Sequence, residues 1–217
     1  MTRNNLIRLL IICAFSVCTS GQSDPDVQLW NEVNITVSIN DKVDLFVPFA
    51  LRIAKSVSTA SDVRVGLGLT FKPTKSLSIT PHHSFIRGRD RRGIFQRENR
   101  SILRLVYKFP KTFVDISHRS QLEFRVRHSG TTWRYRPSIT IEKALPGHLV
   151  KGAKVFVTEE PFYDSASGRF SRNRISGGIS KTITKQLALD IYYLRQGDNF
   201  GSPGTVHVLG TSWKVKL

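Results

Sequence analysis

Apolar and polar side chains alternate, residue by residue, along almost the whole chain after Asp26. Between Val27 and Ile39, apolar residues hold most odd positions, whereas polar residues such as Glu32 and Asn34 hold even ones. Consecutive side chains of a β-strand point to opposite faces of a sheet, so this period predicts strands with one apolar and one polar face. Helical segments would instead repeat apolar residues three and four positions apart, and no segment beyond the N-terminal leader shows that spacing convincingly.

The alternation predicts about eleven strands, at residues 27–39, 43–53, 63–71, 77–87, 96–109, 112–127, 131–143, 154–163, 170–181, 187–196 and 205–217. Each is long enough for a tilted membrane strand of roughly 9–11 residues. We therefore predict an all-β fold, a single antiparallel transmembrane β-barrel of about 10–12 strands. Bacterial barrels have even strand numbers, so an odd count suggests that two strands are merged or that the first segment lies outside the wall. Pro81 suggests a bulge or bend in the fourth strand.

The connections between these segments alternate in character. Short links at residues 73–76, 110–111, 144–148 and 182–186 interleave with more polar or glycine-rich ones, such as "RGRDRRGIF" and "QGDNFGSPG". Outer-membrane barrels have short periplasmic turns and longer external loops, and the interleaving predicts that arrangement.

The first residues have the order of a secretory signal peptide: basic Arg3 and Arg8, an apolar run of about ten residues, then small and polar residues. We expect residues 1–21 to be the signal peptide and residues 22–217 to be one barrel domain. Both cysteines, Cys13 and Cys18, lie within the leader. The mature chain would thus have no disulfide, thiol nucleophile or cysteine-bound metal, and we expect no metal and no other cofactor.

The charge of the mature chain points to anionic surroundings. Removing residues 1–21 leaves 33 − 2 = 31 basic residues against 16 acidic ones, a net charge of +15. Such a charge suits nucleic acid, lipid phosphates or anionic solutes, and export makes nucleic acid the weak candidate. The expected partners are therefore outer-membrane lipids, lipopolysaccharide and small anionic solutes, with the protein in the outer membrane of a Gram-negative bacterium after signal-peptide cleavage.

Arginine and glutamate recur on the polar parity of the strands. A charge that faces the bilayer midplane costs about 2–4 kcal/mol, so if the apolar parity meets lipid, these residues must face the interior. There they would form ion pairs that fill the lumen, or line a pore for anions. The candidates for this charge network or anion-binding site are Arg100, Arg104, Arg119, Glu123, Arg125, Arg127, Arg134, Arg136, Glu142, Glu160 and Arg174.

The function classes that remain are a porin-like barrel with a structural or small-anion transport role, a lipid- or lipopolysaccharide-modifying barrel enzyme, and a soluble periplasmic β-barrel binding protein. Neither a nucleophile-elbow nor an HExxH pattern occurs in the sequence, so we assign no catalytic residue and expect no enzyme. Strand pairing could nevertheless bring together a serine and a histidine, for example within "SHRS" at residues 117–120.

Three stretches carry a family resemblance: "QLWNEVNITVSINDKVDLFVPFALR", "HRSQLEFRVR" with "TWRYRPSI", and "VTEEPFYD" with "RFSRNRISGGIS". They resemble exported bacterial proteins catalogued as domain of unknown function 2490, over nearly all of the mature chain. The resemblance implies an outer-membrane β-barrel-like fold and brings no activity with it. The residues that match the recurrent arginines and glutamates of the family are Arg119, Glu123, Arg125, Arg134, Arg136, Glu160 and Arg174.

Overall fold

The computed structural model shows one closed barrel of eleven β-strands. It describes residues 25–54, 57–89, 93–110, 113–148, 150–198 and 204–217, so the expected signal peptide lies outside the described residues. Within these ranges, no helix is long and apolar enough to span a membrane. The prediction of an all-β barrel of 10–12 strands is confirmed.

The strands follow one another around the barrel in chain order. Their bounds are β1 Asp26–Asn40, β2 Val43–Ala54, β3 Thr59–Phe71, β4 Leu77–Arg89, β5 Phe95–Lys108, β6 Asp115–Arg127, β7 Gly130–Ala144, β8 Ala153–Asp164, β9 Arg169–Thr182, β10 Leu187–Asp198 and β11 Thr205–Lys216. All eleven predicted segments are strands, because the two-residue period matches the pleat of a sheet whose two faces meet different surroundings.

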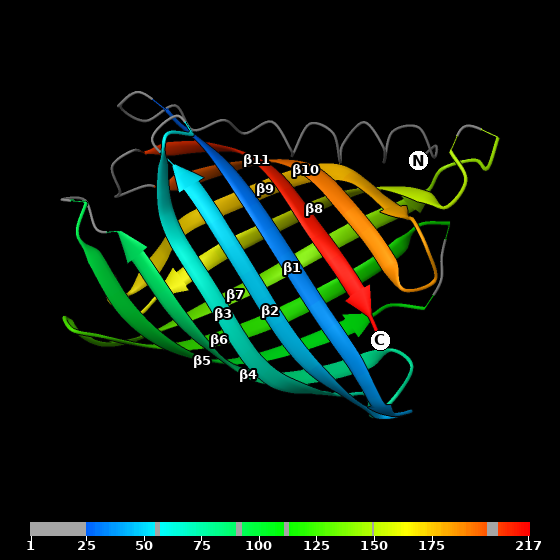
Figure 1. Cartoon of the computed structure of the whole chain (residues 1–217), viewed down its shortest axis with the longest axis horizontal. Helices are drawn as coiled ribbons and strands as arrows, with labels where there is room; N and C mark the ends of the chain where they lie inside the picture. The colour runs from blue at the N-terminus through cyan, green and yellow to red at the C-terminus, as the bar shows by residue number, and fades with distance from the viewer. Residues whose placement is uncertain (1–24, 55–56, 90–92, 111–112, 149, 199–203) are drawn as a thin grey trace, which may run out of the picture.

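The barrel closes through a parallel pair, which corrects the prediction of a wholly antiparallel sheet. Strands β1 and β11 run side by side in the same direction, paired from Asp26↔Val206 to Thr36↔Lys216 (Figure 1). The other neighbouring strands are antiparallel. No strands are merged, and the first segment belongs to the wall, so both explanations of the odd count were wrong. An up-and-down chain with an odd number of strands ends in the direction in which it began, and a parallel ladder can still satisfy both backbones.

The connections do not divide into a short set and a long set, so that part of the prediction was wrong. At the end where β1 finishes, they span residues 41–42, 72–76, 109–114, 145–152 and 183–186; at the other end, they span 55–58, 90–94, 128–129, 165–168 and 199–204. Several strands continue into segments that were predicted as loops, such as β3, which begins at Thr59. Backbone pairing continues there because it does not require alternating side chains.

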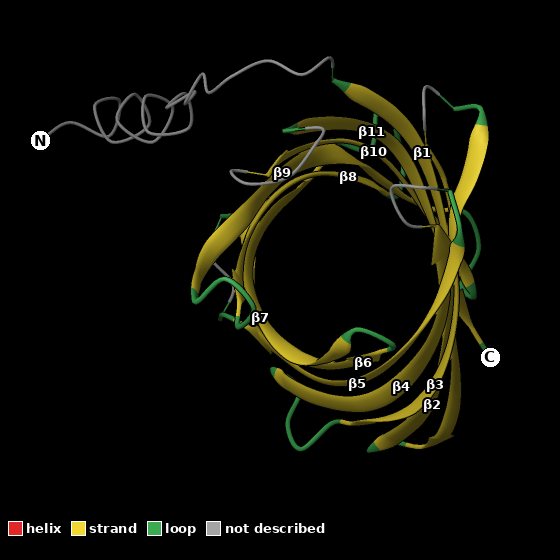
Figure 2. Cartoon of the chain, turned by 90° about the vertical axis from the view of Figure 1, so that its left-hand side faces the viewer, coloured by secondary structure: helices red, strands yellow, loops and turns green. Residues whose placement is uncertain are grey.

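The two faces of the wall differ in polarity as predicted. Large apolar residues are exposed all around the outside, including Leu67, Phe124, Ile191 and Leu209. The strands form a ring around a central space (Figure 2), and charged residues line that space. Pro81 does not produce a bulge, because the register of β4 against β5 continues through the pair Pro81↔Leu103.

An apolar cluster packs inside the barrel beside the parallel pair. It contains Trp30, Leu194, Val206 and Val208, with Tyr192 against it. An indole in the lumen was not predicted, yet Trp30 is only 3% exposed. A Cβ atom at Gly210 would lie 2.1 Å from the Tyr192 ring, so glycine makes room for this ring.

Candidate functional site: the arginine-rich lumen

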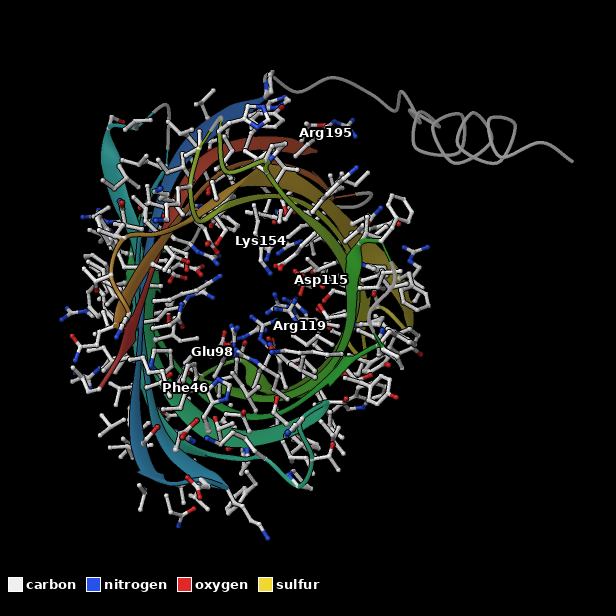
Figure 3. The ribbon with its side chains drawn as sticks, turned by 90° about the vertical axis from the view of Figure 1, so that its right-hand side faces the viewer. Phe46, Glu98, Asp115, Arg119, Lys154 and Arg195 are labelled. Atoms are coloured by element: carbon white, nitrogen blue, oxygen red, sulfur yellow. The ribbon has the colours of Figure 1, made fainter. Side chains whose placement is uncertain are left out.

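The lumen holds two cavities, of about 410 Å³ and about 320 Å³. Viewed from the end near the C-terminus, Lys154, Asp115 and Arg119 point inward around a hollow, whereas Arg195 lies on the outside (Figure 3). The larger cavity is lined by charged, hydroxyl and aromatic side chains. The smaller one is lined by eleven arginines and only two carboxylates, those of Asp62 and Glu98. The interior therefore combines enclosed space with a strong excess of guanidinium groups.

Glu98 on β5 gathers three arginines. Its carboxylate accepts hydrogen bonds from Arg100, from Arg125 through Nε and Nη2 at 2.9 Å each, and from Arg127 Nε at 2.8 Å. The pairing of β5 with β6 places Glu98 opposite Arg127 and Arg100 opposite Arg125. Bidentate contacts of this kind fix the plane of a guanidinium group, so the register of two strands orients three cations.

Two further carboxylates tie β5, β6, β7, β8 and β9 together across the lumen. Glu123 is fully buried and accepts from Arg136 Nη1 at 2.5 Å, while Arg100 Nη1 lies 3.3 Å away. Glu160 accepts from Arg136 Nη2 at 2.8 Å and from Arg119, and Arg174 Nη1 lies 3.7 Å away. Arg136 thus bridges both carboxylates. Buried charges need such partners, because an isolated one would lose its hydration without compensation.

An aromatic ring supports the arginines of β7 and β9. Phe162 on β8 is 1% exposed, and the guanidinium carbons of Arg136 and Arg174 lie 4.4 and 4.6 Å from its ring centroid. Those of Arg134 and Arg172 each lie 5.6 Å away. Cation–π attraction and shape hold the four groups around one ring. Phe162 thereby spaces positive charges that would otherwise repel one another.

Five arginines border both cavities and form what we call the arginine ring: Arg52, Arg64, Arg100, Arg136 and Arg174. They come from β2, β3, β5, β7 and β9, so they surround the lumen rather than lie on one wall. Arg52 also stacks on Trp30, with its guanidinium carbon 3.6 Å from the ring centroid. Anything that passes from one cavity to the other meets this ring.

The structure places the predicted site residues in three groups. Most of them belong to one connected network that extends from the rim at Arg127 to the middle of the lumen: Arg100, Arg119, Glu123, Arg125, Arg127, Arg134, Arg136, Glu160 and Arg174. Arg104 faces the larger cavity, where its Nε donates to Gln121 Oε1 at 3.1 Å. Glu142 lies apart near the end of β7, with its carboxylate 3.3 Å from Lys154 Nζ.

Several members of this network were not among the predicted site residues. The predicted site omits Asp164, Arg172 and Phe162, although Asp164 accepts a 2.5 Å hydrogen bond from Arg134. One signal was available for Arg172, because residues two positions apart on a strand share a face, and Arg174 belongs to the predicted site. The same parity places Phe162 on the face of Glu160, but its apolar side chain interrupts the polar pattern of that face.

Comparison with solved structures gives distant β-barrel likenesses. The KdgM porin is 12% identical, with 79% of this chain and 91% of that chain covered and a TM-score of 0.48. The NanC porin is 9% identical, with 79% and 87% covered and a TM-score of 0.49. An anion-selective porin from Comamonas acidovorans is 12% identical, with 80% and 55% covered and a TM-score of 0.40.

The sequence comparisons give one family. Residues 27–206 match the family described as "Protein of unknown function (DUF2490)". None of the curated proteins compared with this sequence matches it.

Proposed function

We propose that this chain, which belongs to the DUF2490 family of proteins of unknown function, is an outer-membrane barrel that passes small anions through its lumen. The observation that carries the proposal is the arginine ring between the two cavities. A passing solute would meet guanidinium groups from five strands, and these attract anions and repel cations. The family itself supplies no activity.

The outer wall supports a membrane location. Apolar side chains such as Leu67, Phe85 and Leu209, each more than half exposed, would be costly to leave in water on so many strands. A closed barrel leaves no unpaired sheet edge, which makes it one of the two structures that can span a bilayer. The apolar surface and the closed sheet together favour hydrocarbon as the surrounding medium.

The balance of charge supports anions as the solute. Nine of the eleven arginines that line the smaller cavity are ion-paired, but they share only seven carboxylates, so the ion pairs neutralise only part of the positive charge. A lumen filled solely for rigidity would be expected to match its charges, since each unpaired buried charge lowers stability. We interpret the excess of positive charge as a feature that attracts anions into the lumen.

Replacing Arg52 by alanine is expected to weaken anion preference without unfolding the barrel. Its nearest carboxylate, on Glu32, lies 4.0 Å away, so the substitution removes one weak ion pair and the stacking on Trp30 and leaves no strong ion pair broken. In planar bilayers under a KCl gradient, the permeability ratio of chloride to potassium should fall by roughly half or more. Arg195→Ala removes the same charge from the outside of the wall and should leave the ratio unchanged.

Two results would contradict the proposal. Wild-type protein that inserts but prefers potassium would contradict anion passage. Folded, inserted protein that carries no current would instead indicate that the Arg–Glu network plugs the lumen and makes the barrel purely structural.

A second candidate function rests on a polar group on the outer wall. Ser120 Oγ lies 3.0 Å from His118 Nε2 and 3.1 Å from the Tyr135 hydroxyl. His118 and Ser120 share the outward parity of Phe124, so lipid would reach them. A histidine that accepts the hydroxyl proton can activate serine towards an ester carbonyl, which supports a lipid-modifying enzyme as the alternative.

Incubation of the purified barrel with labelled phospholipid tests this alternative. If the pair is catalytic, Ser120→Ala should lower fatty-acid release by at least about 100-fold, because the nucleophile is lost. Ser117→Ala, on the same strand but facing the lumen, should have little effect. Wild-type protein that releases no fatty acid, or equal release by both variants, would exclude the outer-wall site.

A further inference from the structure

Arg104 differs from the other arginines that the strands direct into the lumen. Each of those on the inward parity has a carboxylate oxygen within 4.0 Å, from Arg127 at the rim to Arg136 in the centre. Arg89 and Arg97, which also border the smaller cavity, are exposed and lie on the outward parity of their strands. Among the residues that the structure describes, Arg104 has no carboxylate at that distance. Its positive charge is therefore not neutralised within the barrel.

The surroundings of Arg104 hold its guanidinium in place while leaving its charge available. Its Nε donates to Gln121 Oε1 at 3.1 Å, and Gln121 Nε2 in turn donates to Glu123 at 2.7 Å. The Phe46 ring lies against the group, with its centroid 5.3 Å from the guanidinium carbon. Arg104 remains partly accessible and lines the larger cavity. The Nε side of the Arg104 guanidinium is thus held by Gln121, and the rest of the group faces the larger cavity.

Neighbouring side chains add donors on the same side of the cavity. Arg119, on β6, lines it too, and its buried Nε has no hydrogen-bond partner among the described residues. His82, on β4, also lines the cavity and contacts Phe46 edge-on, with ring centroids 5.5 Å apart. A planar guanidinium fork matches the paired oxygens of a carboxylate or phosphate. The guanidinium groups of Arg104 and Arg119 and the imidazole of His82 surround the cavity with the hydrogen-bond donors that a carboxylate or phosphate requires.

We propose that Arg104 is the centre of a binding site for one small oxyanion, a carboxylate or a phosphate, with Arg119 and His82 as its neighbours. The proposal rests on the proposed function, because the anion reaches this site as a solute of the lumen. It adds to that function a defined anion-binding site in the larger cavity, separate from the arginine ring. The ion pairs of the ring orient and narrow the passage, whereas Arg104 holds the anion.

Equilibrium dialysis of the folded full-length barrel in detergent micelles tests the site directly. The probes are labelled inorganic phosphate and labelled acetate, in a buffer of low ionic strength because screening weakens such contacts. Wild-type protein should bind at least one of them, and Arg104→Gln should weaken that binding by about tenfold or more. Arg104→Gln leaves no carboxylate unpaired, so the variant should fold as the wild type does.

The matched control is Arg127→Gln, which removes one lumen arginine whose partner Glu98 keeps Arg100 and Arg125. It should change anion binding less than about twofold, because the lost charge is at the rim. Arg104→Lys keeps the charge but not the fork, and an intermediate affinity would support bidentate binding. Equal binding by wild type and Arg104→Gln, or no binding of either probe, would overturn the site.

Conductance separates this outcome from that of the proposed function. If chloride current is present in bilayers but neither phosphate nor acetate binds, the pore stands and the Arg104 site fails. If an anion binds through Arg104 but no current flows, the site stands and the pore fails.

Discussion

Replacing Glu123 by glutamine is expected to lower the free energy of unfolding by about 3–5 kcal/mol, the typical loss when one member of a buried ion pair is removed. Glu123 is 0% exposed, and its carboxylate lies between Arg100 and Arg136. Glutamine has a similar shape, so the substitution removes charge rather than volume. The two guanidinium groups would then share only Glu98 and Glu160, which already contact other arginines.

Urea unfolding of the barrel in detergent micelles, followed by tryptophan fluorescence, measures this loss. The control is Glu142→Gln, which neutralises a lumen carboxylate that is 32% exposed and lies 3.3 Å from Lys154. Partly exposed pairs contribute little, so this variant should stay within about 1 kcal/mol of the wild type. Equal stability of the two variants would mean that water, rather than arginine, compensates the charge of Glu123.

Replacing Ile191 by arginine is expected to destabilise the barrel in a bilayer by about 2–4 kcal/mol, because the new charge would face hydrocarbon near mid-depth. Ile191 is 51% exposed and lies in the interior of β10, Leu187–Asp198. In a barrel surrounded by water, an exposed isoleucine could become arginine at little cost. The size of the loss therefore tests the membrane assignment as well as the depth of the residue.

The measurement is reversible unfolding in phospholipid vesicles, and the control is Ile39→Arg. Ile39 is 59% exposed but lies at the end of β1, where an arginine side chain can reach the interface. The Ile39→Arg variant should lose only about 0–1 kcal/mol of unfolding free energy. If both substitutions were harmless in vesicles, the apolar wall would not face lipid.

The strands and their faces could be predicted from the sequence because they depend on a period of two residues. That period placed Phe124 outside and Arg125 inside, and the exposures of 48% and 9% agree. Ion-pair partners depend instead on register, because a shift of one residue would reverse the faces of a whole strand. Nothing in the sequence near Glu98 indicates that Arg125 and Arg127, on the next strand, share its carboxylate.

The inward aromatic residues were harder to predict than the arginines. An apolar side chain on the polar parity looks like an interruption of the pattern, as Trp30 and Phe162 do. In the barrel both rings hold the arginines in position, since guanidinium groups pack against Trp30 and Phe162. Recognising this requires the positions of strands that lie far apart in the sequence.

The parallel pairing of β1 with β11 has a topological consequence. Pro25 and Leu217 emerge from opposite rims, so in a membrane the two ends of the barrel chain would stand in different compartments. If the barrel spans an outer membrane, one end is periplasmic and the other faces the outside of the cell, so during assembly one end of the wall must cross the bilayer. A barrel with an even number of strands never requires this crossing.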